Sequence, residues 1–144
     1  MTINSILKSK NSDAVITVKP GSLVSEAVKT LSDRKIGAVV VSKNGQTADG
    51  ILSERDIVRE MGNRGVGCLT DPVSTMMTAK LVTCAPTDSA DAVLEMMTNG
   101  RFRHLPVMSD GKMIGLISIG DVVKARLAEL SMEKDALEGM IMGH

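Results

Sequence analysis

Aromatic side chains are nearly absent from this chain of 144 residues, which contains one Phe and no Trp or Tyr. Proteins that bind single-stranded nucleic acids rely on such rings to stack the bases, so this class is disfavoured. A net charge is missing too, because 17 basic residues balance 17 acidic ones and leave no field that would attract a polyanion. We therefore expect no nucleic-acid partner, and a flat base bound here would have to lie between aliphatic side chains.

Patterns for membranes, secretion and metals are also missing. No apolar run approaches the roughly 20 residues of a membrane span, and the first residues lack the basic and then apolar pattern of a signal peptide. Cys68 and Cys84 are isolated, without a second Cys or a His at the spacing of metal ligands. We expect a globular cytoplasmic protein with no membrane contact and no bound metal.

The two halves of the chain resemble each other. Equivalent residues differ by 66 in number over most of each half, and by 65 after the turn before the last strand. A register this long is hard to obtain by chance and predicts two copies of one structural unit. The matching pairs are Thr17 with Thr83, Pro20 with Pro86, Leu31 with Met97, Val41 with Val107, Gly50 with Gly115 and Asp56 with Asp121, preceded by Ile3, Ile6 and Leu7 with Val73, Met76 and Met77.

Each half predicts the same order of elements, β-α-β-β-α. A short strand ends at Pro20 or Pro86, and a helix capped by Ser22 or Asp88 follows. Two strands joined by an Asn-Gly or Asp-Gly turn come next, and a second helix closes the unit. Because helices cover only one face of each sheet, we expect an α/β (α+β) fold in which the two sheets pair about a pseudo-two-fold axis. The expected boundaries are 3–62 for the first repeat, 63–72 for a glycine-rich connector, 73–128 for the second repeat and 129–144 for a helical tail.

A Ser-x-x-Asp motif recurs where the last strand of each unit gives way to the last helix. Ser53 with Asp56, and Ser118 with Asp121, could simply cap these helices, because each side chain can accept from free amides of the first turn. In an open sheet, however, this end of the strands is where ligands usually gather. The motif therefore predicts a cap, a ligand site or both.

These residues resemble a known family. The β-α-β-β-α order, Gly50-Ile-Leu-Ser53-Glu-Arg-Asp56, its echo Gly115-Leu-Ile-Ser118-Ile-Gly-Asp121, and Arg103-His-Leu-Pro-Val107 are similar to a tandem pair of CBS domains, the module named after cystathionine beta-synthase. The resemblance covers about residues 3–128. It implies a stand-alone regulatory sensor that binds adenine nucleotides such as AMP, ADP, ATP or NAD(H) in clefts between the repeats. It also implies a disc-like homodimer, with a target protein that the sequence does not identify.

A nucleotide site needs acceptors for the ribose, donors for the phosphate and an apolar slot for the base. Asp56 or Asp121 can accept from both ribose hydroxyls, and Ser53 or Ser118 lies at a helix start that favours an anion. In the family the matching Asp holds ribose and the matching Ser faces phosphate. The base would lie against Ala38, Val39 and Ile51 from one half or His104, Leu105 and Leu116 from the other, with Thr17 or Thr83 near its edge, although ordinary strand core is the alternative for each aliphatic residue.

Basic residues are distributed unevenly between the two halves. Arg103 and His104 correspond to a basic pair that faces phosphate in several family members, whereas the first half has Gly37 and Ala38 at those positions. The two clefts are therefore expected to differ in affinity or in preferred ligand. Arg55 and Lys10 could each donate to phosphate or could simply be solvated.

Two other functions compete with nucleotide sensing. An enzyme is disfavoured, because the chain has only two His and no paired carboxylates on one face, and a nucleophile and base made of Cys84 and His104 would have nothing to orient it. The other alternative is a dimerisation or scaffold module with unoccupied clefts, since capping alone would explain the Ser and Asp residues.

Overall fold

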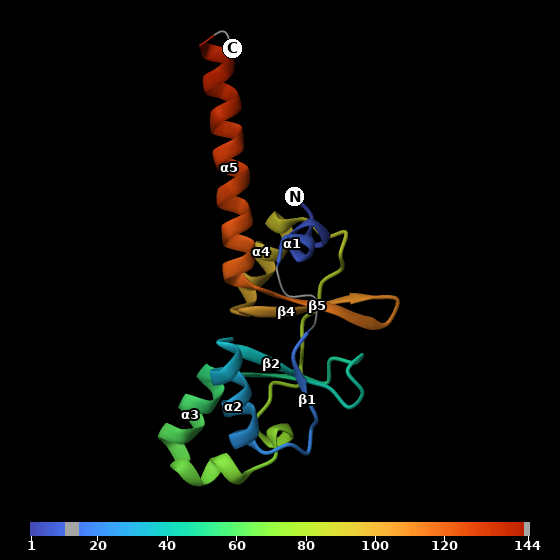
Figure 1. The fold of residues 1–144 in the computed structure, drawn as a ribbon, viewed down its shortest axis with the longest axis vertical. Helices are drawn as coiled ribbons and strands as arrows, with labels where there is room; N and C mark the ends of the chain where they lie inside the picture. Colours follow the sequence, from blue (N-terminus) through green and yellow to red (C-terminus); the bar gives the residue numbers. More distant parts are fainter. Residues whose placement is uncertain (11–14, 143–144) are drawn as a thin grey trace.

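The computed structural model describes residues 1–10 and 15–142 (Figure 1). Both repeats contain the predicted order of helices and strands, apart from the first strand of the second repeat. The elements are α1 (Ile3–Ser9), β1 (Thr17–Val18), α2 (Val24–Arg34), β2 (Ala38–Val41), β3 (Gly50–Ser53), α3 (Glu54–Arg64), the 3-10 helices η1 (Val66–Thr70) and η2 (Val73–Thr75), α4 (Ala90–Gly100), β4 (His104–Ser109), β5 (Lys112–Ser118) and α5 (Ile119–Ile141).

The two sheets differ at one edge. In the first, β1 lies parallel to β2 and β2 lies antiparallel to β3, while the second contains the antiparallel pair β4 and β5. The expected first strand of the second repeat is reduced to one parallel bridge, between Cys84 and Val107. In the first repeat Val40 donates its amide to the Ile16 carbonyl at 3.2 Å, but the equivalent residue in the second repeat is Pro106. Proline has no N–H, so this ladder bond cannot form.

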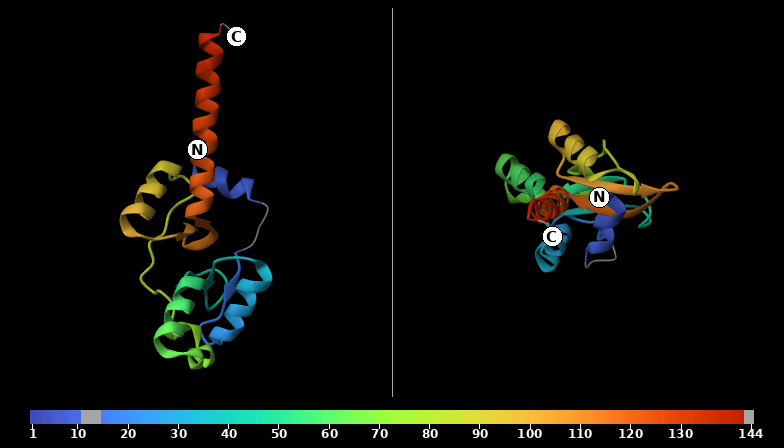
Figure 2. Two further views of the ribbon diagram at one scale, coloured as in Figure 1. Left: turned by 90° about the vertical axis from the view of Figure 1, so that its left-hand side faces the viewer. Right: turned by 90° about the horizontal axis from the view of Figure 1, so that it is seen from above.

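The sheets face each other in the centre of the molecule, and the helices cover their outer faces (Figures 1 and 2). Buried side chains between the sheets include Ala38 and Ile51 from the first repeat and Met113 from the second. Each repeat also has its own core between sheet and helices. The predicted pairing of two β-α-β-β-α units, sheet to sheet, is confirmed.

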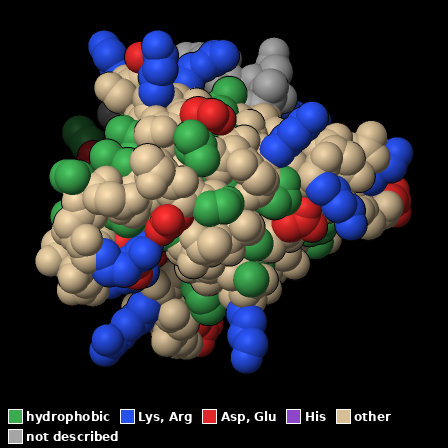
Figure 3. Space-filling view, turned by 90° about the horizontal axis from the view of Figure 1, so that it is seen from below, with side chains coloured by type: hydrophobic (Ala, Val, Ile, Leu, Met, Phe, Trp, Pro, Cys, Tyr) green, Lys and Arg blue, Asp and Glu red, His purple; other side chains and the backbone are tan. Residues whose placement is uncertain are grey.

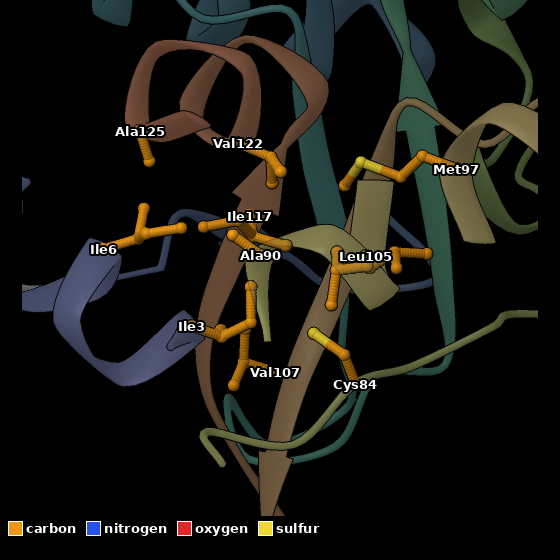
Figure 4. Packing of buried hydrophobic residues seen from close by; sticks show 11 residues of the cluster. Ile3, Ile6, Cys84, Ala90, Met97, Leu105, Val107, Ile117, Val122 and Ala125 are labelled. Atoms are coloured by element: carbon orange, nitrogen blue, oxygen red, sulfur yellow. The ribbon is translucent and has the colours of Figure 1, made fainter. Parts of the chain in front are cut away.

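The segments that lead into the repeats are exchanged. Ile3 and Ile6 of α1 are buried in the core of the second repeat, against Leu105 and Ile117 among others (Figure 4). Conversely, Val73 in η2 is buried in the core of the first repeat. The backbone repeats the exchange: the Ile3 amide donates to the Asp88 carbonyl at 2.9 Å, and the Val73 amide to the Ser22 carbonyl at 2.8 Å. Each lead-in therefore fastens one repeat to the other.

Gly50 and Gly115 make room for these lead-in segments. A methyl group built at Gly115 would lie 2.8 Å from a Leu7 methyl carbon, and one built at Gly50 would lie 2.8 Å from Met77 Cγ. Residues 7 and 77 are the matching lead-in positions. Gly50 and Gly115 lack a side chain because the lead-in residues Met77 and Leu7 pack directly against them.

The first helix of each repeat begins one residue later than predicted. The N-cap of α2 is Leu23, without a side-chain cap, and that of α4 is Ser89, whose hydroxyl accepts from the Ala92 amide. Ser22 and Asp88 precede these caps, and the Asp88 carboxylate instead accepts from the Ala85 amide at 2.8 Å. The prediction that Ser22 and Asp88 are N-caps is therefore wrong, because the chain turns into the helix after them.

The last helix, α5, extends far beyond the two repeats (Figures 1 and 2). It runs without a break through the closing helix of the second repeat and the predicted tail as far as Ile141, whereas residues 143–144 lie outside the described residues. Its buried residues are Val122 and Ala125, both in its first two turns. Across residues 1–10 and 15–142, no helix combines the length and apolar character that a membrane crossing requires.

Candidate ligand clefts between the two repeats

Two clefts of similar size lie between the repeats, and each contains one Ser-x-x-Asp motif. The Asp121 cleft has a volume of about 570 Å³ and the Asp56 cleft one of about 510 Å³. Both take one wall from each repeat. Ser118 and Asp121 lie opposite Ala38, and Ser53 and Asp56 lie opposite Arg103.

Both motifs form capping boxes. The Ser53 hydroxyl accepts from the Asp56 amide at 3.2 Å while the Asp56 carboxylate accepts from the Ser53 amide at 3.0 Å. The second box has matching distances of 3.1 and 2.9 Å between Ser118 and Asp121. The capping prediction is confirmed. Each box also fixes its carboxylate at a helix start beside a cleft.

In the Asp121 cleft the carboxylate already has a cation. Lys10 Nζ donates to Asp121 Oδ2 at 2.8 Å and to the Leu116 carbonyl at 3.0 Å. Burial alone would raise the pKa of Asp121, but the hydrogen bonds from Lys10 and from the Ser118 amide outweigh it and lower this pKa. Lys10, which the sequence left open between a solvated residue and a phosphate donor, thus lies inside the cleft.

The Asp56 cleft is rich in arginine. Arg55, Arg59, Arg101 and Arg103 line it and are all exposed, and Arg59 Nη2 donates to Asp56 Oδ1 at 3.1 Å. The acidic side chains in the same lining are Glu54 and Asp56. This cleft therefore has a net positive rim that attracts anions.

His104 lines both clefts. Burial lowers its pKa; the carboxylate of Asp121 raises it, and the nearby cations Lys10 and Arg103 lower it further, with a net decrease. The neutral imidazole is therefore favoured, and it can offer one donor and one acceptor to either cleft.

Ten of the fourteen predicted binding residues line a cleft. The other four are Thr17, Val39, Thr83 and Leu105, which neither lining includes. Val39 and Leu105 are completely buried in the cores under the helices. Side chains of a strand alternate between its faces, so Ala38 and His104 face a cleft while their neighbours cannot. The residues in the linings are Ala38, His104, Leu116, Ser118 and Asp121 in the Asp121 cleft, and Ile51, Ser53, Arg55, Asp56, Arg103 and again His104 in the Asp56 cleft.

The sequence grouped the apolar residues by half, and the structure corrects this grouping. Because the sheets face each other, Ala38 lies with Leu116, and Ile51 lies with Arg103 and His104. The basic residue Arg103 therefore lines the cleft that holds the motif of the other repeat. The linings of the two clefts differ in charge, and the arginine-rich cleft is that of Asp56, whereas the expected difference in affinity or preferred ligand stays a prediction.

Several lining residues were not foreseen. Ile36 and Phe102 occupy equivalent positions before β2 and β4, and each lines the cleft that holds the other repeat's motif. Their matching places in the repeat were a usable signal. Arg59 in α3 and Arg101 at the C-cap of α4 had no such signal, because exposed arginines are common at the protein surface.

Features typical of metal or cysteine chemistry are not found in the described residues. Within 1–10 and 15–142, no cluster of three or more His, Cys, Asp or Glu side chains could hold a metal ion. Cys84 is buried in the core of the second repeat, and burial, with the nearby charge of Asp88, raises the pKa of its thiol to about 11. A protonated buried thiol is a poor nucleophile, which argues against the pair of Cys84 and His104.

Comparisons with known proteins agree with this architecture. A model of the CBS domain matches residues 9–63 and 73–128. The mitochondrial CBS domain-containing protein CBSX3 of Arabidopsis thaliana is 36% identical over 99% of this chain and 72% of its own length. Among solved structures, a CBS-domain containing protein from Agrobacterium tumefaciens has a TM-score of 0.82 at 42% identity, covering 88% of this chain and 99% of that one. A protein with CBS domains from Burkholderia ambifaria has a TM-score of 0.83 at 38% identity, covering 89% and 95%.

More distant structures share the fold alone. CBSX2, solved in complex with AMP, has a TM-score of 0.72 at 24% identity over 88% of this chain and 96% of that one. A further CBS domain pair, solved with 5′-methylthioadenosine and S-adenosyl-L-methionine, has a TM-score of 0.78 at 19% identity over 90% and 98%. Because the CBS domain model matches twice in tandem and the solved structures share this architecture, the chain belongs to the CBS domain family.

Proposed function

We propose that this CBS pair is a regulatory module that binds an adenosine-type nucleotide in its clefts. The observation that carries the proposal is that each Ser-x-x-Asp motif lies at a helix start inside its own cleft between the repeats. Both volumes fall in the range of small-molecule sites, about 300–1,000 Å³. The complexes of related pairs with AMP and S-adenosyl-L-methionine support this class of ligand.

The clefts offer the three kinds of contact that such a ligand needs. Asp56 or Asp121 would accept from the ribose hydroxyls, through hydrogen bonds to a charged group worth about 1.5–3 kcal/mol each. Apolar side chains such as Ile51 or Leu116 would flank the base. The free amides at the start of α3 or α5 would face a phosphate group.

The two clefts should prefer different ligands. Four arginines line the Asp56 cleft, so it should favour a di- or triphosphate. In the Asp121 cleft Lys10 is paired with Asp121, so a phosphate chain meets less positive charge there than beside the four arginines. We therefore propose that the Asp56 cleft binds the more highly phosphorylated nucleotide and binds it more tightly.

The test is isothermal titration of wild type and variants with AMP, ATP, NAD(H) and S-adenosyl-L-methionine. Asp56→Asn and Asp121→Asn keep an acceptor for the capping box but remove the charge. Each should weaken one class of site roughly 10- to 100-fold, as expected for the loss of one such hydrogen bond. Glu26→Gln is the matched control, because Glu26 is exposed in the first turn of α2 and lines neither cleft. Wild-type affinity in both Asp variants would remove the ribose assignment.

A scaffold with unoccupied clefts is the second candidate, favoured by one observation. The capping boxes, together with the Lys10–Asp121 ion pair, already use both motifs without a ligand. If no adenosine compound binds at millimolar concentration, this function replaces the first. In either case we propose a non-catalytic module that acts as a homodimer on a target protein still to be identified. A cytoplasmic location stays a prediction from the sequence.

A further inference from the structure

The outer part of α5 is a helix without a core. After Ala125 the helix continues to Ile141 with no buried side chain. Its base is held by ion pairs, from Arg126 to Asp91 at 2.6 Å and from the N-terminal amine to Glu129 at 3.0 Å. In folded proteins most of the stability of a helix comes from the packing of an apolar face and not from helix propensity. The outer turns of α5 therefore need a surface to pack on.

One face of α5 carries an apolar stripe. Its members are separated alternately by four and three residues, which is the spacing of the core positions of a coiled coil. The apolar members are between 40% and 84% exposed. At the opposite end of the molecule, hydrophobic side chains lie scattered among polar ones instead (Figure 3). The α5 stripe consists of Val123, Leu127, Leu130, Lys134, Leu137 and Ile141.

We propose that the α5 stripe packs against the same stripe of a second copy of this chain, in antiparallel orientation. The full overlap places Leu127 beside the partner's Leu137 and Leu130 beside the partner's Lys134. The contact runs over the 19 residues from Val123 to Ile141 of each helix, or about 27 Å. A surface that is complementary to itself closes a two-fold dimer and leaves no stripe exposed.

Charge complementarity selects the second copy and its orientation. In the antiparallel register Lys124 lies beside the partner's Glu138, and symmetry gives this attractive pair twice. A single like-charge contact, between Glu133 and the partner's Glu133, lies next to the two-fold axis. In a parallel coiled coil Glu133 would face the partner's Glu138 twice, and no opposite charges would meet. The antiparallel dimer is therefore the favourable one.

Lys134 is the one charged member of the stripe, and its Nζ lies 3.8 Å from Glu138 Oε1 of the same helix. Its aliphatic stem can cover the partner's Leu130 while the ammonium group reaches water. The length of the overlap sets the register, because sliding one helix by a heptad would leave two of the six stripe residues of each chain without a partner.

Association is tested by analytical ultracentrifugation of the full chain. Leu130→Asp combined with Leu137→Asp should raise the dissociation constant of the dimer at least tenfold. The matched control is Met132→Asp, because Met132 is 69% exposed on the same helix and lies outside the stripe. Circular dichroism and thermal unfolding check that both variants keep the folded repeats. Equal association of the double variant and wild type would overturn the proposal, and so would a monomeric wild type.

Orientation is tested by single cysteines under mild oxidation. Glu133→Cys should cross-link to itself, because two copies of this position meet beside the antiparallel two-fold axis. Leu137→Cys should not, since it faces position 127 of the partner. The native cysteines do not interfere, because Cys68 and Cys84 are 2% and 5% exposed. Cross-linking through Leu137→Cys, or through neither variant, would overturn the antiparallel dimer.

Discussion

The close approach at Gly50 gives a sharp test of the exchanged lead-in segments. A methyl group at this position would meet the Met77 sulfur and would lie 2.8 Å from its Cγ and 3.1 Å from its Cβ. Overpacking of this kind costs about 1–3 kcal/mol, and the smaller entropy of an unfolded alanine offsets about 0.4–1 kcal/mol. Gly50→Ala should therefore lower the free energy of unfolding by about 1–2 kcal/mol. Gly115→Ala should cost less, because it meets mainly the mobile methyl groups of Leu7.

The assay is urea unfolding followed by circular dichroism, with thermal unfolding as a second measure. Gly62→Ala in α3 is the control, because an added methyl group at this position meets nothing within 4 Å. The higher helix propensity of alanine should raise the free energy of unfolding of this variant by about 0.5–1 kcal/mol. Combining Gly50→Ala with Met77→Ala should cost clearly less than the sum of the two single changes, because the clash disappears. A Gly50→Ala protein as stable as wild type, or additivity in the double variant, would refute the packing of the second lead-in on β3.

Three further results are expected. Because folding lowers the pKa of Asp121, its ion pair with Lys10 stabilises the protein fully above the unfolded pKa of about 3.9. This stabilisation is lost as the pH falls through the pKa of the folded state. The difference in unfolding free energy between wild type and Lys10→Met should therefore shrink from about pH 7 to about pH 3. Ser53→Ala and Ser118→Ala should each lower the free energy of unfolding by about 1 kcal/mol in urea titrations, because each removes an N-cap, and a neutral result would contradict the capping geometry. With a thiol pKa of about 11, Cys84 should react with iodoacetamide at pH 8 far more slowly in the native protein than in urea, and equal rates would contradict its burial.

Local patterns predicted most of the elements. The strands and helices follow short-range rules, and Ser53 and Ser118 cap α3 and α5 as their spacing to Asp56 and Asp121 indicates. The repeat supported these assignments, because the same element was predicted independently in each half of the chain. The exception was the strand near Cys84, where Pro106 on the neighbouring strand removes a donor. That loss depends on which backbone groups face each other, and neither segment alone contains this information.

The candidate clefts were only partly predictable. The sequence identified Asp56 and Asp121 as equivalent carboxylates at helix starts, but it did not indicate that Arg103 lies in the cleft of Asp56. One wall of each cleft is made by residues from the opposite repeat. The spacing of residues along the sequence does not say how close these residues lie to the Ser-x-x-Asp motif. Lys10 is the clearest case, because its ion pair joins residues that are 111 positions apart.

By itself the sequence determined the two-fold repetition, the order of elements in each unit and the two capped carboxylates, because these depend on side-chain period, turn chemistry and hydrogen bonds between near neighbours. Only the tertiary structure decided that the lead-in segments cross over, that each cleft borrows a wall from the other repeat, and that α5 extends beyond any core. Those features depend on which apolar faces, distant from one another along the chain, pack together. The free energy gained by burying these faces depends on how well their shapes fit in three dimensions.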